Sequence, residues 1–337
     1  MDDCGTVHEV VFDPMYRLTQ AYTLLASIAA VFPLVHLIFY KIQKTTFNKN
    51  VKCLFMLYFT QILISVINNV VVFAHHVVIP FVSDTFCYVL VNPFKLRIFQ
   101  YLGVFGMSSP MLTNLGITLE RIFALIFARF YEKSRLHIGV VIGVIVTAAD
   151  IVIIAVLFRE EHFDKPMMSY FMVPDTSGKG MNVLCYTLLT INVLNLFCNY
   201  ILFKVNTVLS QKWRSDLSTR YQMEENIITT KFSTSIAFLH VFFFMLYLVF
   251  TLLIRLVGPQ FLTSPADLLA IRGVYITIPT YNLVIGFLAC SVLTLLQNRK
   301  VAKVTAEVAI TYSGLEGAQI HDEAILHAWN SANIKMP

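Results

Sequence analysis

An acidic and a basic residue stand side by side at positions 120 and 121, directly after a stretch with no charged residue. Glu120 and Arg121 can form an ion pair that holds the arginine and, on breaking, releases it to another acceptor. This chemistry is the reversible pairing of charges rather than the cleavage of bonds. A simpler interpretation is a solvated helix end whose arginine anchors at lipid headgroups. The choice depends on where the pair lies in the fold.

A second charged segment further along the chain contains Arg220, Tyr221, Glu224 and Glu225. Arg220 and Glu224 are four residues apart, so a helix would place them on one face. A plain solvated helix accounts for that spacing. A more specific hypothesis is that Glu224 or Glu225 pairs with Arg121 in the resting protein.

The sequence lacks the residue patterns that catalysis or metal binding requires. His75, His76 and His240 do not have the spacing that puts two ligands on one helical face. No nucleophile is accompanied by a recognisable base. We therefore predict no enzyme activity, no metal site and no cofactor.

The elements that position these charges are predicted from seven long uncharged runs. The runs are 18–40, 53–83, 98–119, 136–158, 180–203, 232–254 and 273–298. Each exceeds the roughly 20 residues that a helix needs to cross about 30 Å of hydrocarbon. The composition agrees, because only 13% of residues are charged, against about 25% in soluble domains. We predict an all-α membrane protein, a seven-transmembrane helix bundle.

The charges between these runs predict the orientation of the bundle. Most of the 25 Lys and Arg residues lie in the tail and in the loops after the first, third and fifth runs. The positive-inside rule then puts the N-terminus (1–17) outside, the seven-helix domain at 18–298 and a cytoplasmic tail at 299–337. Such scattered basic residues do not form a nucleic-acid-binding face. Membrane lipid is the expected surrounding.

Polar residues within the runs recur at helical spacing. They are Gln61, Ser65 and Asn68 in the second run, and Asn192, Asn195 and Asn199 in the fifth. We expect interhelical hydrogen bonds from both sets, with the lining of a ligand cavity as the alternative. Asp150, the one charge inside a run, costs about 2.5 to 3.5 kcal/mol at the membrane centre. It should face the bundle, as a protonated structural residue or as the partner of a cationic ligand.

Two further signals concern how helices are joined. Gly139 and Gly143 have the GxxxG spacing that permits close helix packing, within the chain or in a homo-oligomer. Cys87 and Cys185 are both expected near the outer face, where an oxidising exterior could join them. Two free thiols are the alternative, and Cys4 is a competing partner.

Several short motifs with a shared cytoplasmic placement carry a family resemblance. They are Phe47-Asn48-Lys49-Asn50, Glu120-Arg121, Tyr131-Glu132, Arg220-Tyr221-Gln222 and Glu225-Asn226. Together they resemble the nematode serpentine chemoreceptors of the Sra superfamily, nearest the alpha or alpha-beta class. The sequence departs from the rhodopsin-like pattern, because the sixth run has no proline and the seventh contains Pro279-Thr280-Tyr281-Asn282.

The resemblance implies a G-protein-coupled receptor that binds an external small molecule and activates a heterotrimeric G protein. It implies a multi-pass protein of the plasma membrane, located in sensory neuron cilia. The residues it assigns to coupling or switching are Glu120, Arg121, Tyr131, Arg220, Tyr221, Glu224 and Glu225. The alternative is a ligand-gated channel or transporter of the seven-helix type. Transporters commonly carry inverted repeats, and none is apparent here.

Overall fold

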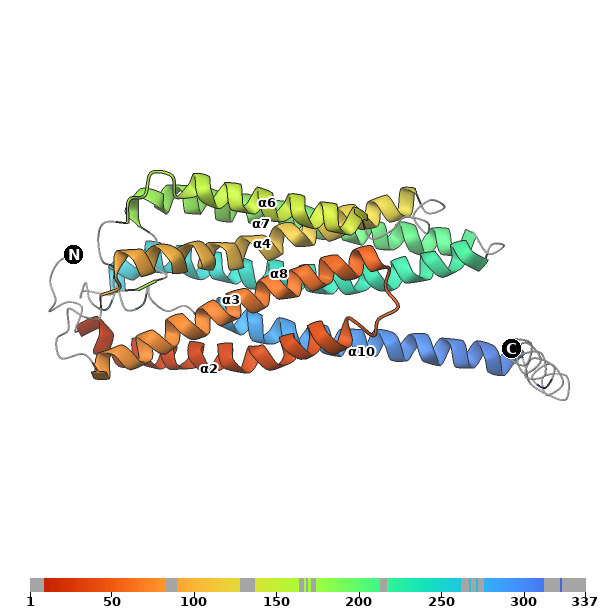
Figure 1. Ribbon diagram of the computed structural model, residues 1–337, viewed down its shortest axis with the longest axis horizontal. Coiled ribbons are helices and arrows are strands. Elements are labelled where there is room, and N and C mark those ends of the chain that lie inside the picture. The colour runs from red at the N-terminus through yellow and green to blue at the C-terminus, as the bar shows by residue number, and fades with distance from the viewer. Residues whose placement is uncertain are drawn as a thin grey trace, which may run out of the picture. The chain divides into compact units, whose positions relative to one another are not determined.

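Seven long helices make up most of the computed structural model, which describes residues 9–82, 90–127, 137–163, 167, 169–170, 174–212, 217–261, 267, 271, 276–311 and 322. They are α2 (Pro14–His36), α3 (Lys49–Val82), α4 (Pro93–Ile126), α6 (His137–Leu157), α7 (Asp175–Lys212), α8 (Leu217–Phe261) and α10 (Thr277–Thr311). A short π-helix, η1 (Leu37–Lys41), extends α2. In Figure 1 the helices α2, α3, α4, α6, α7 and α8 run lengthwise along the horizontal axis of the view. The predicted seven-helix architecture is confirmed.

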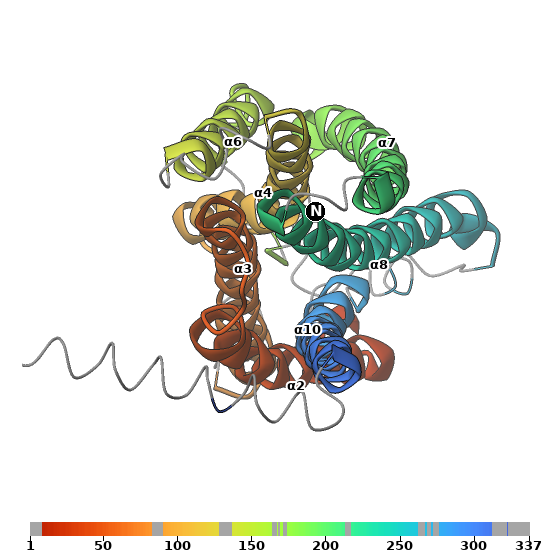
Figure 2. The same cartoon turned by 90° about the vertical axis from the view of Figure 1, so that its right-hand side faces the viewer.

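The helix α4 differs from the other six in composition. By their length and apolar composition alone, those six could cross a membrane. In α4 the apolar pattern is interrupted by buried Ser108, Ser109, Thr113, Asn114 and Thr118. It packs against α3, α6, α7 and α8, and Figure 2 shows it surrounded by them. A helix that faces protein rather than lipid can carry polar side chains that find partners inside.

Two helices begin with the same local chemistry. Asp13 precedes α2 and accepts a hydrogen bond from the backbone N–H of Tyr16 at 2.8 Å. Asn92 precedes α4 and accepts one from the N–H of Phe94 at 2.9 Å. In both cases a proline follows the cap. A side-chain oxygen at the cap and a proline at the first helical position are favourable for starting a helix.

The bundle buries polar residues and exposes apolar ones. On α6, Val140, Val144, Ile145 and Val152 are exposed, while Asp150 is fully buried. In water this arrangement would be unfavourable, but in a bilayer the apolar faces meet lipid. Asp150 thus faces the bundle interior, near Ser108 of α4.

The polar stripes on α3 and α7 both meet α4. Thr113 donates to the side-chain oxygen of Gln61 at 2.8 Å, joining α4 to α3. The amide of Asn199 donates to the hydroxyl of Thr118 at 2.7 Å, joining α7 to α4. Asn192 donates to the carbonyl of Leu188 in its own helix. Asn195 is likewise buried.

Gly139 and Gly143 face α3 within the same chain. A Cβ added to Gly139 would lie 2.4 Å from the carbonyl oxygen of Asn50, and one added to Gly143 would lie 3.1 Å from Leu57. The backbone N–H of Gly139 also donates to the side chain of Asn50 at 3.2 Å. The GxxxG spacing therefore serves a close contact between α6 and α3.

At the end of the bundle where α2 begins, Arg17 compensates for a proline within α3. Pro80 has no N–H to donate to the carbonyl of His76 four residues earlier. Arg17 of α2 donates to that carbonyl at 3.4 Å and to the carbonyl of Val77 at 3.3 Å. Its guanidinium also lies 4.4 Å from the centre of the Phe81 ring. A cation near an aromatic face is attracted to it, so α2 and α3 are tied together here.

The segment between α6 and α7 covers part of the same end. Met167 accepts a hydrogen bond from the backbone N–H of Val91 at 2.8 Å, an isolated antiparallel bridge. Tyr170 packs edge-on against His76 and Phe99. Burial raises the pKa of the Tyr170 hydroxyl above its ordinary value. This tyrosine therefore stays protonated at neutral pH.

The chain divides into two compact units, Met1–Cys290 and Ser291–Pro337. The boundary falls within α10, which continues as helix to Thr311. The basic residues Arg299, Lys300 and Lys303 belong to this continuation. The sites described below lie in the first unit.

We expect Gly139→Ala to destabilise the protein, because its methyl group would overlap the backbone of α3. Overpacking of this kind costs about 1 to 3 kcal/mol. Thermal unfolding in detergent should show a lower midpoint. The control is Gly178→Ala on α7, where an added Cβ has no neighbour within 4 Å. Equal midpoints for both variants would contradict the close α3–α6 contact.

Candidate functional site

The charged pair on α4 is fully enclosed. Glu120 and Arg121 are 0% and 1% exposed. The arginine Nε lies 2.5 Å from one carboxylate oxygen of Glu120, and its second terminal nitrogen lies 2.7 Å from the other. The remaining terminal nitrogen donates to the side-chain oxygen of Asn226 on α8 at 2.9 Å. A buried charge is tolerated when it is paired and hydrogen-bonded, and this arginine meets both conditions.

Glu225, the residue before Asn226 on α8, contacts a different element. The carboxylate of Glu225 accepts a hydrogen bond from the backbone N–H of Asn48. Asn48 is also the cap of α3, because its side chain accepts from the N–H of Asn50 at 3.0 Å. A glutamate within the same helix often makes this contact to the cap N–H. Here Glu225 of α8 makes the contact, and the negative charge of its carboxylate is favourable at the N-terminus of α3.

The loop between α2 and α3 is fixed from both sides. The ammonium of Lys52 donates to the carbonyls of Gln43 and Thr45 at 3.1 and 2.9 Å. Phe47 lies against Phe232 of α8, with ring centres 6.1 Å apart. The same loop therefore contacts α3 through hydrogen bonds and α8 through aromatic packing.

Phe232 packs into a cluster of aromatic rings beneath the Glu225 contact. Its ring centre is 4.9 Å from that of Phe55, in an edge-on arrangement, and 6.4 Å from that of Phe59. Phe232, Phe55 and Phe59 are fully buried. Aromatic pairs at such distances add about 0.5 to 1.5 kcal/mol beyond burial. The cluster thus fixes α8 on α3 close to the polar contacts.

The structure brings only some of the predicted switch residues together. Arg121 meets Glu120 and Asn226, while the neighbouring Glu225 meets Asn48. Glu224 is half-buried on the same helix. Tyr131 and Glu132 lie outside the described residues, and so do the side chains of Arg220 and Tyr221, although their backbone is part of α8. The sequence motifs contain Asn226 and Asn48, but neither residue was predicted to have a role.

Nearer the opposite end, three helices meet at a hydrogen-bonded group of side chains. The hydroxyl of Tyr281 on α10 lies 2.7 Å from Nδ1 of His240 on α8. The hydroxyl of Tyr58 on α3 lies 2.9 Å from that of Tyr281 and 3.3 Å from the same ring nitrogen. If Tyr58 donates to Tyr281, and Tyr281 donates to Nδ1, both hydroxyl protons have acceptors. All three residues are buried.

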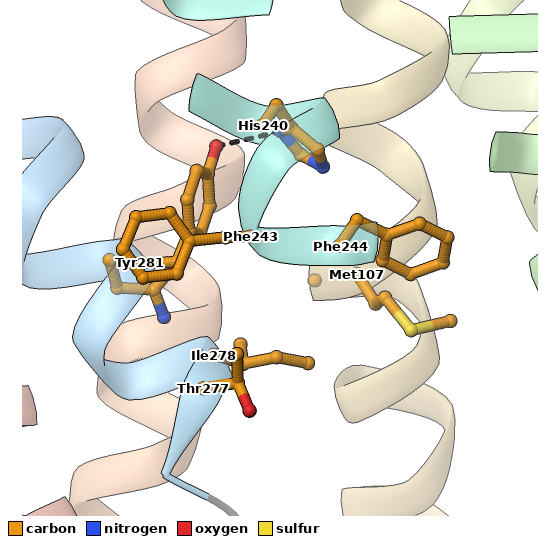
Figure 3. A pocket seen from close by; sticks show the side chains of 9 residues that line it. Met107, His240, Phe243, Phe244, Thr277, Ile278 and Tyr281 are labelled. Carbon is orange, nitrogen blue, oxygen red and sulfur yellow. Dashed lines mark hydrogen bonds between the residues drawn. The ribbon is translucent and has the colours of Figure 1, made fainter. Parts of the chain in front are cut away.

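A small cavity opens beside this group. Figure 3 shows Met107 and Phe244 together on one side, with Phe243 and Tyr281 on the other and Ile278 and Thr277 below them. Gly106, His240 and Asn282 complete the lining, so α4, α8 and α10 all contribute. Its volume is about 20 Å³, enough for roughly one water molecule. A larger molecule enters only when these helices or their side chains move.

The structure describes only one of the two cysteines that were predicted to pair. Cys185 on α7 is buried against Met111, Leu188 and Phe244. Cys87 lies outside the described residues. The disulfide stays a prediction. Among the described residues, no three His, Cys, Asp or Glu side chains form a group that could hold a metal ion.

These features define a class of protein. A seven-helix bundle with a polar interior, an arginine held at one end of the third helix and a cavity toward the other end is typical of G-protein-coupled receptors. Residues 12–244 match the family described as serpentine type 7TM GPCR chemoreceptor Srb. The chain belongs to this family and is a chemosensory G-protein-coupled receptor.

Individual relatives support the assignment over nearly the whole chain. Serpentine receptor class beta-6 of Caenorhabditis elegans is 63% identical over 331 residues, covering 98% of both chains. Class beta-7 of the same organism is 31% identical, covering 98% of this chain and 95% of the relative. Class beta-3 is 32% identical, covering 99% and 98%.

The comparisons correct one prediction and confirm others. The motifs indicated the alpha or alpha-beta class, whereas the relatives and the family match place the chain in class beta. The short motifs identified the kind of receptor but were too few to separate its classes. Membership in this family favours a receptor over the channel, transporter and enzyme alternatives. As a multi-pass receptor of this kind it takes small molecules and a G protein as its general partners.

We expect Tyr281→Phe to lower stability, because the hydroxyl bridges Tyr58 and His240 within the bundle. Leaving a buried polar group without its partner costs about 1 to 3 kcal/mol. The midpoint of thermal unfolding in detergent measures this loss. Tyr186→Phe is the control, because Tyr186 is exposed on α7. An unchanged midpoint for Tyr281→Phe would show that the hydrogen-bonded group carries no stability.

Proposed function

We propose that a small molecule entering the cavity displaces α8 and thereby releases Arg121 to a heterotrimeric G protein. The observation that carries the proposal is the contact of two consecutive residues of α8 with two different elements. Asn226 holds Arg121 on α4, and Glu225 holds the capped start of α3. Moving one helix therefore breaks both contacts together.

The helix α8 connects the cavity with the charged site. His240, Phe243 and Phe244 line the cavity, while Asn226 lies 14 residues before His240 on the same continuous helix. At 1.5 Å per residue this separation is about 21 Å. Because the cavity is too small for most molecules, occupation requires displacement of its walls. A stiff helix that forms one wall can carry that displacement to its other end.

The energetics are suited to a switch. Hydrogen bonds to charged groups contribute about 1.5 to 3 kcal/mol, and 1.4 kcal/mol is a tenfold change in an equilibrium. Losing one such contact would shift the ratio of active to resting protein by about tenfold or more. A ligand that prefers the displaced state shifts the same equilibrium in the same direction.

The surface that contacts the G protein would be built around the freed arginine. Its proposed residues are Glu120, Arg121, Tyr131, Arg220, Tyr221, Glu224 and Glu225. The basic residues of the neighbouring loops support a cytoplasmic location of this end. We further propose that the receptor acts in the plasma membrane of sensory neurons, in their cilia, where external chemicals arrive.

We predict that Asn226→Leu raises basal signalling, because the variant removes the side-chain oxygen of α8 to which Arg121 donates. An increase of several-fold in ligand-independent G-protein activation, at equal surface expression, is expected. The control is Ser235→Ala, which removes a side chain that bonds only a carbonyl of its own helix. Basal activity equal to that of the native receptor would exclude Asn226 as a restraint.

A second variant tests the neighbouring contact. Glu225→Ala removes the carboxylate that accepts from the N–H of Asn48, so basal activity should also rise. Because both contacts break in one movement of α8, the double variant with Asn226→Leu should fall short of the product of the two single effects. If the two effects on basal activity multiply in the double variant, the two contacts do not break in one movement of α8.

A further inference from the structure

The amide of Asn282 has an unsatisfied donor at the wall of the cavity. Asn282 is 2% exposed, and it is one of the nine residues that line the space. Within the described part of the chain its Nδ2 atom makes no hydrogen bond. Leaving a buried donor unpaired is unfavourable, and a bound molecule with an acceptor removes that penalty.

The rest of the lining restricts what that molecule can be. Met107, Phe243, Phe244 and Ile278 provide apolar surface on several sides. None of the described lining residues is Asp, Glu, Lys or Arg, so the wall offers no carboxylate to a cationic amine. A mostly apolar site with a few placed polar groups is typical of small-molecule pockets.

Two of the polar residues around the cavity, Tyr281 and His240, are already engaged in a contact between helices. The hydroxyl of Tyr281 and Nδ1 of His240 bond each other. The hydroxyl of Tyr58 completes that group from α3. Asn282 follows Tyr281 directly on α10 and is not part of the network. It is thus a buried donor that a ligand can bind without breaking a contact between helices.

We propose that the cavity recognises a small apolar molecule that carries a hydrogen-bond-accepting oxygen, with the Nδ2–H of Asn282 as its donor. The inference rests on the proposed role of the cavity as the ligand site, and it adds the chemistry of the ligand. The apolar body lies among Met107, Phe244 and Ile278, and the oxygen faces α10. Expansion of the cavity to admit that body displaces α8, as the proposed function requires.

The test measures binding separately from signalling. Purified receptor in detergent is titrated with unbranched methyl ketones, with alkanes of the same length and with the corresponding primary amines, and thermal unfolding is followed. Ketones should raise the midpoint more than alkanes or amines do. In Asn282→Leu, which keeps an apolar side chain of similar size, ketone affinity should fall about tenfold, the worth of one hydrogen bond of about 1.4 kcal/mol.

Two further variants keep the result interpretable. Thr190→Val removes a hydroxyl of α7 that bonds a carbonyl of its own helix, outside the lining of the cavity, and should leave ketone binding unchanged. Met107→Phe fills the cavity from α4 and should abolish binding while Asn282 is intact. Equal stabilisation by alkanes and ketones, preference for the amine, or unchanged ketone affinity in Asn282→Leu would each overturn the inference. Ketone binding without G-protein activation would instead overturn the proposed function and leave the ligand chemistry standing.

Discussion

The bundle depends on one constraint: no water is available in the hydrocarbon to satisfy polar groups, so a polar side chain is stabilised by facing the interior of the protein rather than lipid. This constraint explains why α4, with its serines, threonines and Asn114, lies among four other helices rather than facing lipid. It also explains why the amides of α3 and α7 point toward α4. The same constraint requires that the buried Arg121 be paired, as it is with Glu120 and Asn226.

Close approach of backbones supplies the rigidity that such polar contacts need. Hydrogen bonds are directional, so donors and acceptors on different helices must be positioned to a few tenths of an ångström. Gly139 against Asn50, and Gly106 against Ser65, bring α6 and α4 into direct contact with α3. Against this rigid group, α8 is held by aromatic packing at Phe232 and by polar contacts near its start. In the proposed mechanism α8 is the element that moves.

Part of the site follows directly from residue order. The seven spans, the burial of Asp150 and the location of Glu120 and Arg121 at a helix end are consequences of hydropathy and charge. The cavity is different, because Met107, His240 and Tyr281 are far apart in the chain and meet only through the packing of α4, α8 and α10. The short motifs could not identify the class of receptor, which was decided by similarity over nearly the whole chain.

The sequence alone determined that charged residues of α4 and α8 share one end of the bundle, because alternating spans leave no other arrangement. Which side chain of α8 meets Arg121 was decided by the tertiary structure. Successive residues of a helix point about 100° apart, so Glu225 and Asn226 cannot face the same neighbour. The packing of Phe232 against Phe55 fixes the rotation of α8, and that rotation directs the amide to Arg121 and the carboxylate to the start of α3.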